Sequence, residues 1–137
     1  MTLFVDTSVW YAAADEGDLS NERAKEILSG GDRLVTTDHV LVETWTLLRW
    51  RVNRDAAEAF WRGLRSGVAG IETVGEADLE AAWTIGRDFA DQDFSLVDRT
   101  SFAVMRRLGV VRAAAFDEDF AVFRFGPKRQ EAFEIVR

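Results

Sequence analysis

The chain has 137 residues, a length that fits one domain with a sizeable core. Hydrophobic residues make up 47% and include 10 Phe and 5 Trp, which excludes a disordered chain, and the lack of cysteine excludes a disulfide framework and a thiolate zinc site. The net charge of −7 argues against a protein whose whole surface grips nucleic acid, but not against an enzyme whose acids are neutralised by metal ions.

Short apolar runs alternate with helical patterns along the chain. We predict strands at 2–6, 33–37, 71–74 and 113–116, and a last edge strand at 133–136. Helices are predicted up to about residue 15 and then over 19–29, 39–52, 55–66, 76–90 and 95–108, and several of them end at glycine. This alternation predicts an α/β fold, a parallel sheet with helices on both faces.

The N-terminus has no basic segment followed by a long apolar stretch, so no signal peptide is predicted. No apolar run approaches the ~20 residues of a membrane span. We therefore expect a cytoplasmic protein without membrane contact.

Four acids stand where a parallel sheet would place a functional site. Asp6 and Asp117 follow predicted strands, Glu43 interrupts an apolar helix face, and Asp98 begins a helix with apolar residues on its face. Each has an ordinary alternative: a helix N-cap for Asp6, a glutamate that reaches water for Glu43, and a capping-box partner of Ser95 for Asp98. Asp117 has the alternative of a solvated loop, although phenylalanines flank its acidic run.

If the four acids converge, their mutual repulsion would force some of them to take up a proton unless divalent cations neutralise them. Ligation by oxygen atoms alone suits Mg²⁺ or Mn²⁺ rather than zinc.

The sequence resembles PIN-domain ribonucleases, and more narrowly the VapC-type toxins of type II toxin–antitoxin systems. The resemblance covers nearly the whole chain and is carried by four ordered motifs, LFVDTSVW at 3–10, VLVETWTLL at 40–48, FSLVDRTSFAVM at 94–105 and AFDEDFAVF at 115–123. It implies one PIN domain over 1–137, with three α/β/α layers around a parallel sheet of about four to five strands.

The resemblance also implies roles for individual residues. Asp6, Glu43, Asp98 and Asp117 would form the catalytic pocket, with Asp6, Asp98 and Asp117 as metal ligands. Three further residues would be accessory: Ser8, which would orient the first acid or a water molecule, Asp119 and Asp93. Ala115 stands where the family often has Thr or Ser, and Asp119 where it often has His, so whether Asp117 or Asp119 reaches the metal stays open.

The implied activity is Mg²⁺-dependent hydrolysis of RNA, with Mn²⁺ as a possible substitute and products that carry a 5′-phosphate and a 3′-hydroxyl. The implied partners are the RNA substrate, a cognate antitoxin that covers an apolar groove, and a second copy in a homodimer. The residues that bind RNA are unknown. The candidates for a basic rim, which could equally be solvated helix charges, are Arg49, Arg51, Arg99 and Arg106.

Aromatic residues and the single histidine are assigned mainly to structure. Trp10, Trp45, Trp61 and Trp83 are expected to pack in the core, although Trp10 and Tyr11 are also candidates for stacking on a base. His39 is expected to be a surface residue rather than a ligand.

Three alternative functions are weaker. An aspartate-based phosphatase would need a second acid where Ser8 stands, and a receiver domain would need paired acids after the first strand. A PIN-like RNA-binding or interaction module without cleavage activity would not need all four acids, which are present.

Overall fold

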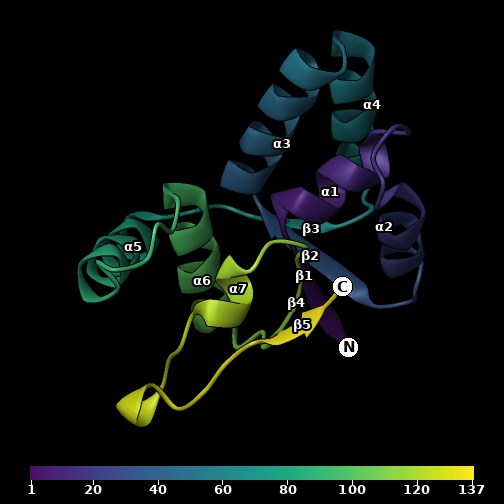
Figure 1. Cartoon of the computed structure of the whole chain (residues 1–137). Coiled ribbons are helices and arrows are strands. Elements are labelled where there is room, and N and C mark those ends of the chain that lie inside the picture. Colours follow the sequence, from purple (N-terminus) through teal and green to yellow (C-terminus); the bar gives the residue numbers. More distant parts are fainter.

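A five-stranded, all-parallel sheet forms the centre of the protein, which the computed structural model describes over all 137 residues (Figure 1). The strand order is β3-β2-β1-β4-β5. The strands are β1 (Thr2–Val5), β2 (Arg33–Thr37), β3 (Gly70–Glu72), β4 (Arg112–Ala114) and β5 (Glu134–Val136).

The central strand β1 is buried on both faces. Leu3, Phe4 and Val5 are all fully buried, and Phe4 pairs with Val35 of β2 on one side and with Ala113 of β4 on the other. A continuous apolar run is what a parallel strand covered by helices on both faces requires. The residue that follows β1 is therefore held at the middle of the sheet's C-terminal edge.

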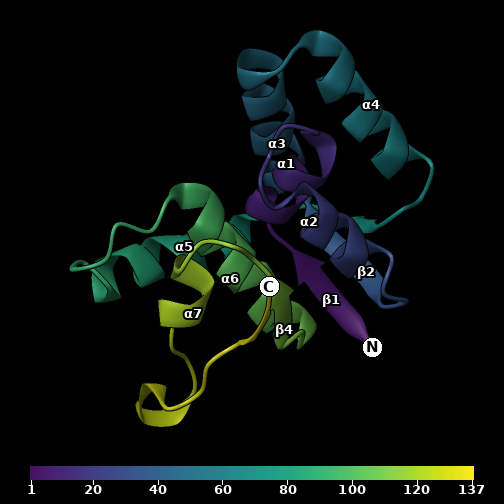
Figure 2. The same ribbon diagram turned by 45° about the vertical axis from the view of Figure 1, so that its right-hand side comes forward.

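Helices cover both faces of the sheet. In Figure 1, α1 and α2 lie on one side of the sheet, and α5, α6 and α7 lie on the other, which confirms the predicted three-layer fold. Figure 2 shows α3 and α4 as a pair above α1. The helices are α1 (Thr7–Ala14), α2 (Asn21–Leu28), α3 (Asp38–Arg51), α4 (Arg54–Arg65), α5 (Glu76–Asp88), α6 (Leu96–Leu108) and α7 (Asp119–Val122), with a 3₁₀ turn at Pro127–Arg129.

The fourth strand differs from its predicted range. It was expected at 113–116 but ends at Ala114, because the Phe116 N–H donates to the Ser8 hydroxyl, 3.0 Å away, instead of to a neighbouring strand. The short helix α7 follows, in a segment where no helix was predicted. The last strand, β5, lies at the sheet edge as predicted.

The prediction that four tryptophans pack in the core is wrong for two of them. Trp10 is buried and its indole N–H donates to the Val5 carbonyl at 3.1 Å, and Trp45 is half-buried against the core. Trp61 and Trp83 are 43% and 70% exposed. Each directly follows a buried residue of its helix, Phe60 in α4 and Ala82 in α5, so it points away from the buried stripe.

Phenylalanine side chains from the C-terminal half of the chain form an aromatic cluster in the core. Phe102 of α6 is fully buried and contacts the rings of Phe94, Phe120, Phe123 and Phe133.

None of the helices is long and apolar enough to cross a membrane.

Candidate active site

Asp6 is both the N-cap of α1 and a buried acid at the sheet edge. Its Oδ2 accepts hydrogen bonds from the Ser8 N–H at 3.2 Å and from the Ser8 hydroxyl at 2.8 Å. Its own N–H donates to the Ala114 carbonyl at 3.0 Å. Asp6 is only 2% exposed. The cap, which the sequence presented as an alternative to a functional role, is therefore present, and the same side chain lines the pocket.

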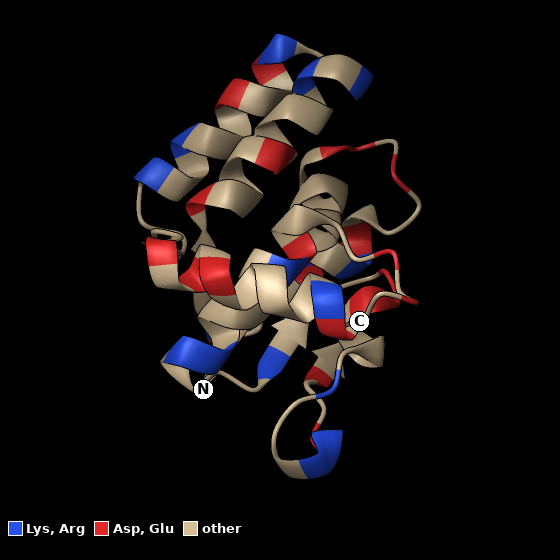
Figure 3. Cartoon of the chain, turned by 90° about the vertical axis from the view of Figure 1, so that its left-hand side faces the viewer, with Lys and Arg blue, Asp and Glu red and all other residues tan.

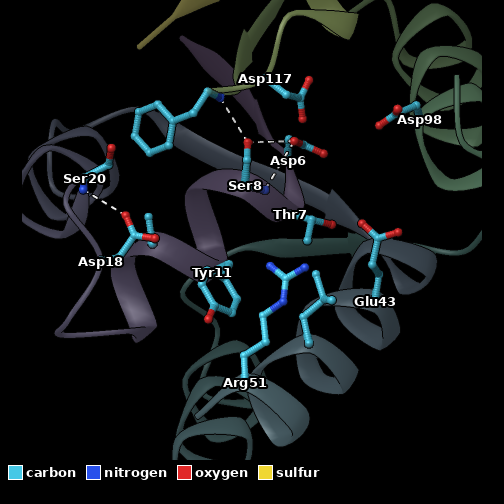
Figure 4. Close-up of a pocket in the computed structure, with 13 residues that line it drawn as sticks. Asp6, Thr7, Ser8, Tyr11, Asp18, Ser20, Glu43, Arg51, Asp98 and Asp117 are labelled. Atoms are coloured by element: carbon cyan, nitrogen blue, oxygen red, sulfur yellow. Dashed lines mark hydrogen bonds between the residues drawn. The ribbon is translucent and has the colours of Figure 1, made fainter. Parts of the chain in front are cut away.

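Ser8 connects the first acid to the loop that carries the last one. Its hydroxyl donates to Asp6 and accepts from the Phe116 N–H, as the dashed lines in Figure 4 show. Phe116 precedes Asp117, so this hydroxyl fixes the segment that brings Asp117 beside Asp6.

Asp98 is held in the same way at the start of α6. It forms a capping box with Ser95: the Asp98 N–H donates to the Ser95 hydroxyl at 3.0 Å, and the Ser95 N–H donates to Asp98 Oδ2 at 3.4 Å. Asp98 is 8% exposed. The capping box, expected as an alternative to function, is present and leaves the carboxylate facing the pocket (Figure 4).

Asp6, Asp98 and Asp117 form one cluster, in which one carboxylate oxygen from each lies within 4.8 Å of the others. No ion pair of the protein involves these three acids. Asp6 and Asp98 are buried, whereas Asp117 is not. Carboxylates this close repel one another, and no side chain of the protein supplies a compensating positive charge.

Burial and repulsion make two of these acids poor at losing their protons. Burial, followed by the charge of Asp117, raises the pKa of Asp6 to about 8. Burial, followed by a hydrogen bond with Asp119 and the charge of Asp6, raises the pKa of Asp98 to about 8. A divalent cation would supply the missing positive charge, and the all-oxygen donor set fits Mg²⁺ or Mn²⁺.

The Thr7 hydroxyl supports this fit. Thr7 lines the pocket and is 5% exposed, yet its Oγ1 has no hydrogen-bond partner within the protein. A buried hydroxyl without a partner is unfavourable, so its place beside three acids indicates a site that is completed by a bound group.

Of the other predicted residues, some line the pocket or contact its acids, and others lie outside it. Glu43 points into the pocket from α3, opposite Asp6, but is not part of the close cluster of three (Figure 4). Asp119 begins α7, where its N–H donates to Asp117 Oδ1 at 3.2 Å, and its side chain contacts Asp98. Asp93 is exposed and does not line the pocket. His39 is half-buried, 3.3 Å from the Thr100 hydroxyl, and is not part of the cluster.

The cavity has a volume of about 400 Å³ and reaches beyond the acids. Sequence reasoning missed several residues of its wall, namely Thr7, Asp18 and Ser20, and did not place Tyr11 and Arg51 in it together. The spacing of four residues between Glu43, Leu47 and Arg51 could have indicated that Arg51 shares the face of Glu43.

The other arginines proposed for a basic rim lie outside this cavity. In the view of Figure 3, Lys and Arg are scattered among Asp and Glu along the chain and do not form one continuous basic strip. The Arg99 Nε donates to the Phe94 carbonyl at 3.0 Å, the Arg106 guanidinium lies over the Phe125 ring, and Arg49 lies over Trp50.

Comparison with known proteins gives consistent matches over most of the chain. The PIN domain profile matches residues 3–126. The 23S rRNA-specific endonuclease VapC20 of Mycobacterium tuberculosis is 42% identical over 133 residues, which cover 94% of this chain and 99% of the relative.

Solved structures agree with this match. The crystal structure of VapC20, described as a sarcin–ricin loop cleaving toxin, superimposes with a TM-score of 0.83 at 40% identity, covering 87% of this chain and 92% of that chain. The VapBC2 complex of Rickettsia felis, solved with a DNA fragment from its promoter, has the same fold, with a TM-score of 0.70 at 10% identity and coverage of 99% and 98%.

Proposed function

Because the chain belongs to the PIN-domain family, as an endoribonuclease toxin of the VapC type, we propose that it cuts 23S rRNA at the pocket formed by its clustered acids. The observation that supports this proposal is the cluster of Asp6, Asp98 and Asp117, whose oxygens lie within 4.8 Å of one another without a cationic partner. Such a cluster is suited to binding divalent cations. These would supply the concentrated positive charge that hydrolysis of an anionic phosphodiester needs.

Asp6, Asp98 and Asp117 would hold Mg²⁺, with Mn²⁺ as a substitute. The bound ion would neutralise charge on the phosphodiester and make a water molecule more acidic. Ser8 would hold the Asp6 carboxylate in place through its hydroxyl, and Asp119 would support Asp98.

Glu43 faces the cluster from the opposite wall and is not engaged in a hydrogen bond or ion pair within the protein. We assign it to orient the attacking water and accept a proton from it. Attack at phosphorus with departure of the 3′ oxygen would leave a 5′-phosphate and a 3′-hydroxyl.

The substrate proposal follows from the VapC20 relative, whose described target is the sarcin–ricin loop. Proteins that recognise RNA by sequence mostly bind single-stranded loops, where bases can be splayed out. We therefore propose this loop of 23S rRNA as the target, and the cytoplasm as the place of action because the ribosomes are there.

The VapC type also supports two protein partners. We propose that a cognate antitoxin binds the chain and blocks the pocket, and that the toxin forms a homodimer in that complex. Co-expression with the neighbouring gene product, followed by size-exclusion chromatography with light scattering, tests both.

The nuclease assignment is tested by incubating the purified chain with ribosomes in Mg²⁺, in Mn²⁺ and with a chelator, and mapping RNA ends by primer extension. We expect one main cut that the chelator abolishes. Asp6→Asn and Asp98→Asn should lower the rate by at least about a hundredfold, because each removes a negatively charged ligand.

The matched control is Asp91→Asn, an exposed acid outside the pocket, purified in the same way, which should cut like the wild type. If the wild type and the Asp6→Asn variant give the same RNA ends in every metal condition, the chain is not a nuclease, and a binding module without cleavage activity becomes the better description.

A further inference from the structure

The pocket continues from the acidic cluster as a groove between α1 and α3. Glu43, Leu47 and Arg51 line it from α3, where a spacing of four residues places them along one face. From α1, Thr7, Ser8, Tyr11 and Ala12 form the facing wall. Arg51 lies eight residues beyond Glu43, about 12 Å along the helix axis.

Arg51 is the only basic side chain among the residues that line this cavity, five of which, apart from it, are acidic. It forms no ion pair with any of them. Its guanidinium instead lies over the Tyr11 ring, 5.6 Å from the ring centre, and Figure 4 shows it directed into the cavity. A guanidinium without a carboxylate partner is available to an anion from outside the protein.

Tyr11 is held in place on its side of the groove. Its hydroxyl donates to Asp15 Oδ2 at 3.0 Å, so the ring is fixed at both its polar end and its helix attachment. The adjacent acid, Asp18, accepts a hydrogen bond from the Ser20 N–H at 2.8 Å. The far end of the groove therefore presents one oriented aromatic ring and one guanidinium without an ion-pair partner, with the Asp18 carboxylate held beside them.

We propose that this far end, formed by Tyr11 and Arg51, binds the RNA strand on one side of the bond that is cut. Arg51 contacts a phosphate beyond the scissile one, and Tyr11 stacks on a base. Guanidinium groups bind phosphate through paired hydrogen bonds, and bases stack readily on aromatic rings. This inference rests on the proposed nuclease function, because a strand whose scissile phosphate lies at the acids must leave the site along a groove.

RNA fits this end better than an acidic peptide does. A peptide carboxylate would pair with Arg51, but the peptide would not need the neighbouring site for divalent cations. An RNA strand presents a regular series of phosphates, so one strand can satisfy the acidic end through the cation and the far end through Arg51.

The first test measures binding without cleavage. In an Asp98→Asn background with Mg²⁺ present, the probe is a fluorescent RNA hairpin that carries the sarcin–ricin loop sequence, followed by anisotropy. Arg51→Ala should weaken binding about tenfold, the effect of losing one hydrogen bond to a charged group. It should also reduce the slope of log affinity against log salt by about 0.7 to 0.9.

The matched control is Arg49→Ala, which removes an equal charge from the same helix end, from a residue that lies over Trp50 outside the groove. It should change affinity less than about twofold and leave the salt slope nearly unchanged. Tyr11→Phe should bind like the parent, whereas Tyr11→Leu should weaken binding about tenfold, because only the second variant removes the ring.

The second test uses the cutting enzyme with the same hairpin. Arg51→Ala should raise KM about tenfold and change kcat less than about threefold, because Arg51 binds a part of the strand that does not react. Arg51→Lys should restore the salt slope while recovering only part of the affinity, since lysine keeps the charge without the planar fork.

The outcomes separate this inference from the nuclease assignment. Wild-type cleavage that Asp6→Asn abolishes, together with equal affinities and KM values for Arg51→Ala and Arg49→Ala, overturns the binding role and leaves the nuclease intact. Loss of antitoxin binding in Arg51→Ala with unchanged RNA affinity also overturns it and assigns this end to the protein partner.

Discussion

Asp6 and Asp98 each accept hydrogen bonds at the N-terminus of a helix, and these bonds hold two buried carboxylates close together. The N-terminus of a helix favours a negative charge, whereas burial and the neighbouring acids oppose it. Burial and the neighbouring acids dominate over the helix N-terminus, since the pKa of both carboxyls is raised. Asp78 shows the contrary case, because its hydrogen bonds with Arg107 lower its pKa.

The raised pKa values predict how the metal-free protein responds to pH. Between about pH 4 and about pH 8 the folded state binds more protons at Asp6 and Asp98 than the unfolded state does, so stability falls as pH rises through this window. Thermal unfolding in a chelator should therefore give a lower Tm at about pH 8 than at about pH 5. Added Mg²⁺ should raise Tm more at the higher pH.

Asp98→Asn supplies the comparison, because an amide has no proton to lose in this range. Its metal-free Tm should fall less than that of the wild type between the two pH values. A wild-type Tm that stays level or rises with pH in the chelator would contradict the assigned burial and repulsion.

Among the secondary structure elements, those with strong local signals could be predicted from the sequence. Thr37 caps α3 through a hydrogen bond to the Val40 N–H, and Gly109 ends α6 with a left-handed conformation, both as the residue types indicate. The start of α7 could not be predicted, because its four residues are fixed by Phe120 packing between Phe4 and Phe102. That contact joins segments distant in the sequence, so no local pattern contains it.

Two glycines predict opposite effects of the same substitution. Gly109 has φ +69°, whereas Gly63 lies inside α4. Apart from the neighbouring backbone, no heavy atom lies within 4 Å of a Cβ added at either. Gly109→Ala should therefore destabilise the protein by about 1 kcal/mol through backbone strain. Gly63→Ala should stabilise it by up to about 1 kcal/mol, because alanine favours the helix.

Chemical denaturation of the two variants beside the wild type measures both effects. Gly109→Asn should lose less than Gly109→Ala, since asparagine tolerates the left-handed region better. If both alanine variants changed the free energy of unfolding in the same direction, local conformation would not be what distinguishes these positions.

At the scale of the whole molecule, the site depends on contacts between distant parts of the chain. Asp6 and Asp117 could be chosen from the sequence because the ends of parallel strands meet at one edge, and Asp98 because it shares a helix face with apolar residues. Arg51 and Tyr11 could not be paired, because their meeting depends on how α1 crosses α3, which periodicity does not specify. The exposure of Trp83 was mispredicted for a related reason: composition indicates an aromatic core without indicating which aromatic residues form it.

Phe102 is the residue whose loss should most weaken this long-range assembly. It is fully buried and contacts rings from the loop before α6, from α7 and from the segment before β5. Phe102→Ala should lower the free energy of unfolding by about 3–5 kcal/mol. The exposed Trp83→Ala should change it by no more than about 0.5 kcal/mol. Equilibrium urea unfolding compares the two, and similar values would contradict the observed core.

The central place of β1 has a consequence for the synthesis of the protein. β1 pairs with β2, which follows closely in the sequence, and with β4, which follows only after α2 through α6 have been made. Pairing across so long a separation is slow and comes late in folding. Until β4 and Asp117 have left the ribosome, the acidic cluster lacks one member and the Ser8 hydroxyl lacks the Phe116 N–H. The ribosome that translates this toxin therefore does not carry a working nuclease until the domain is nearly complete.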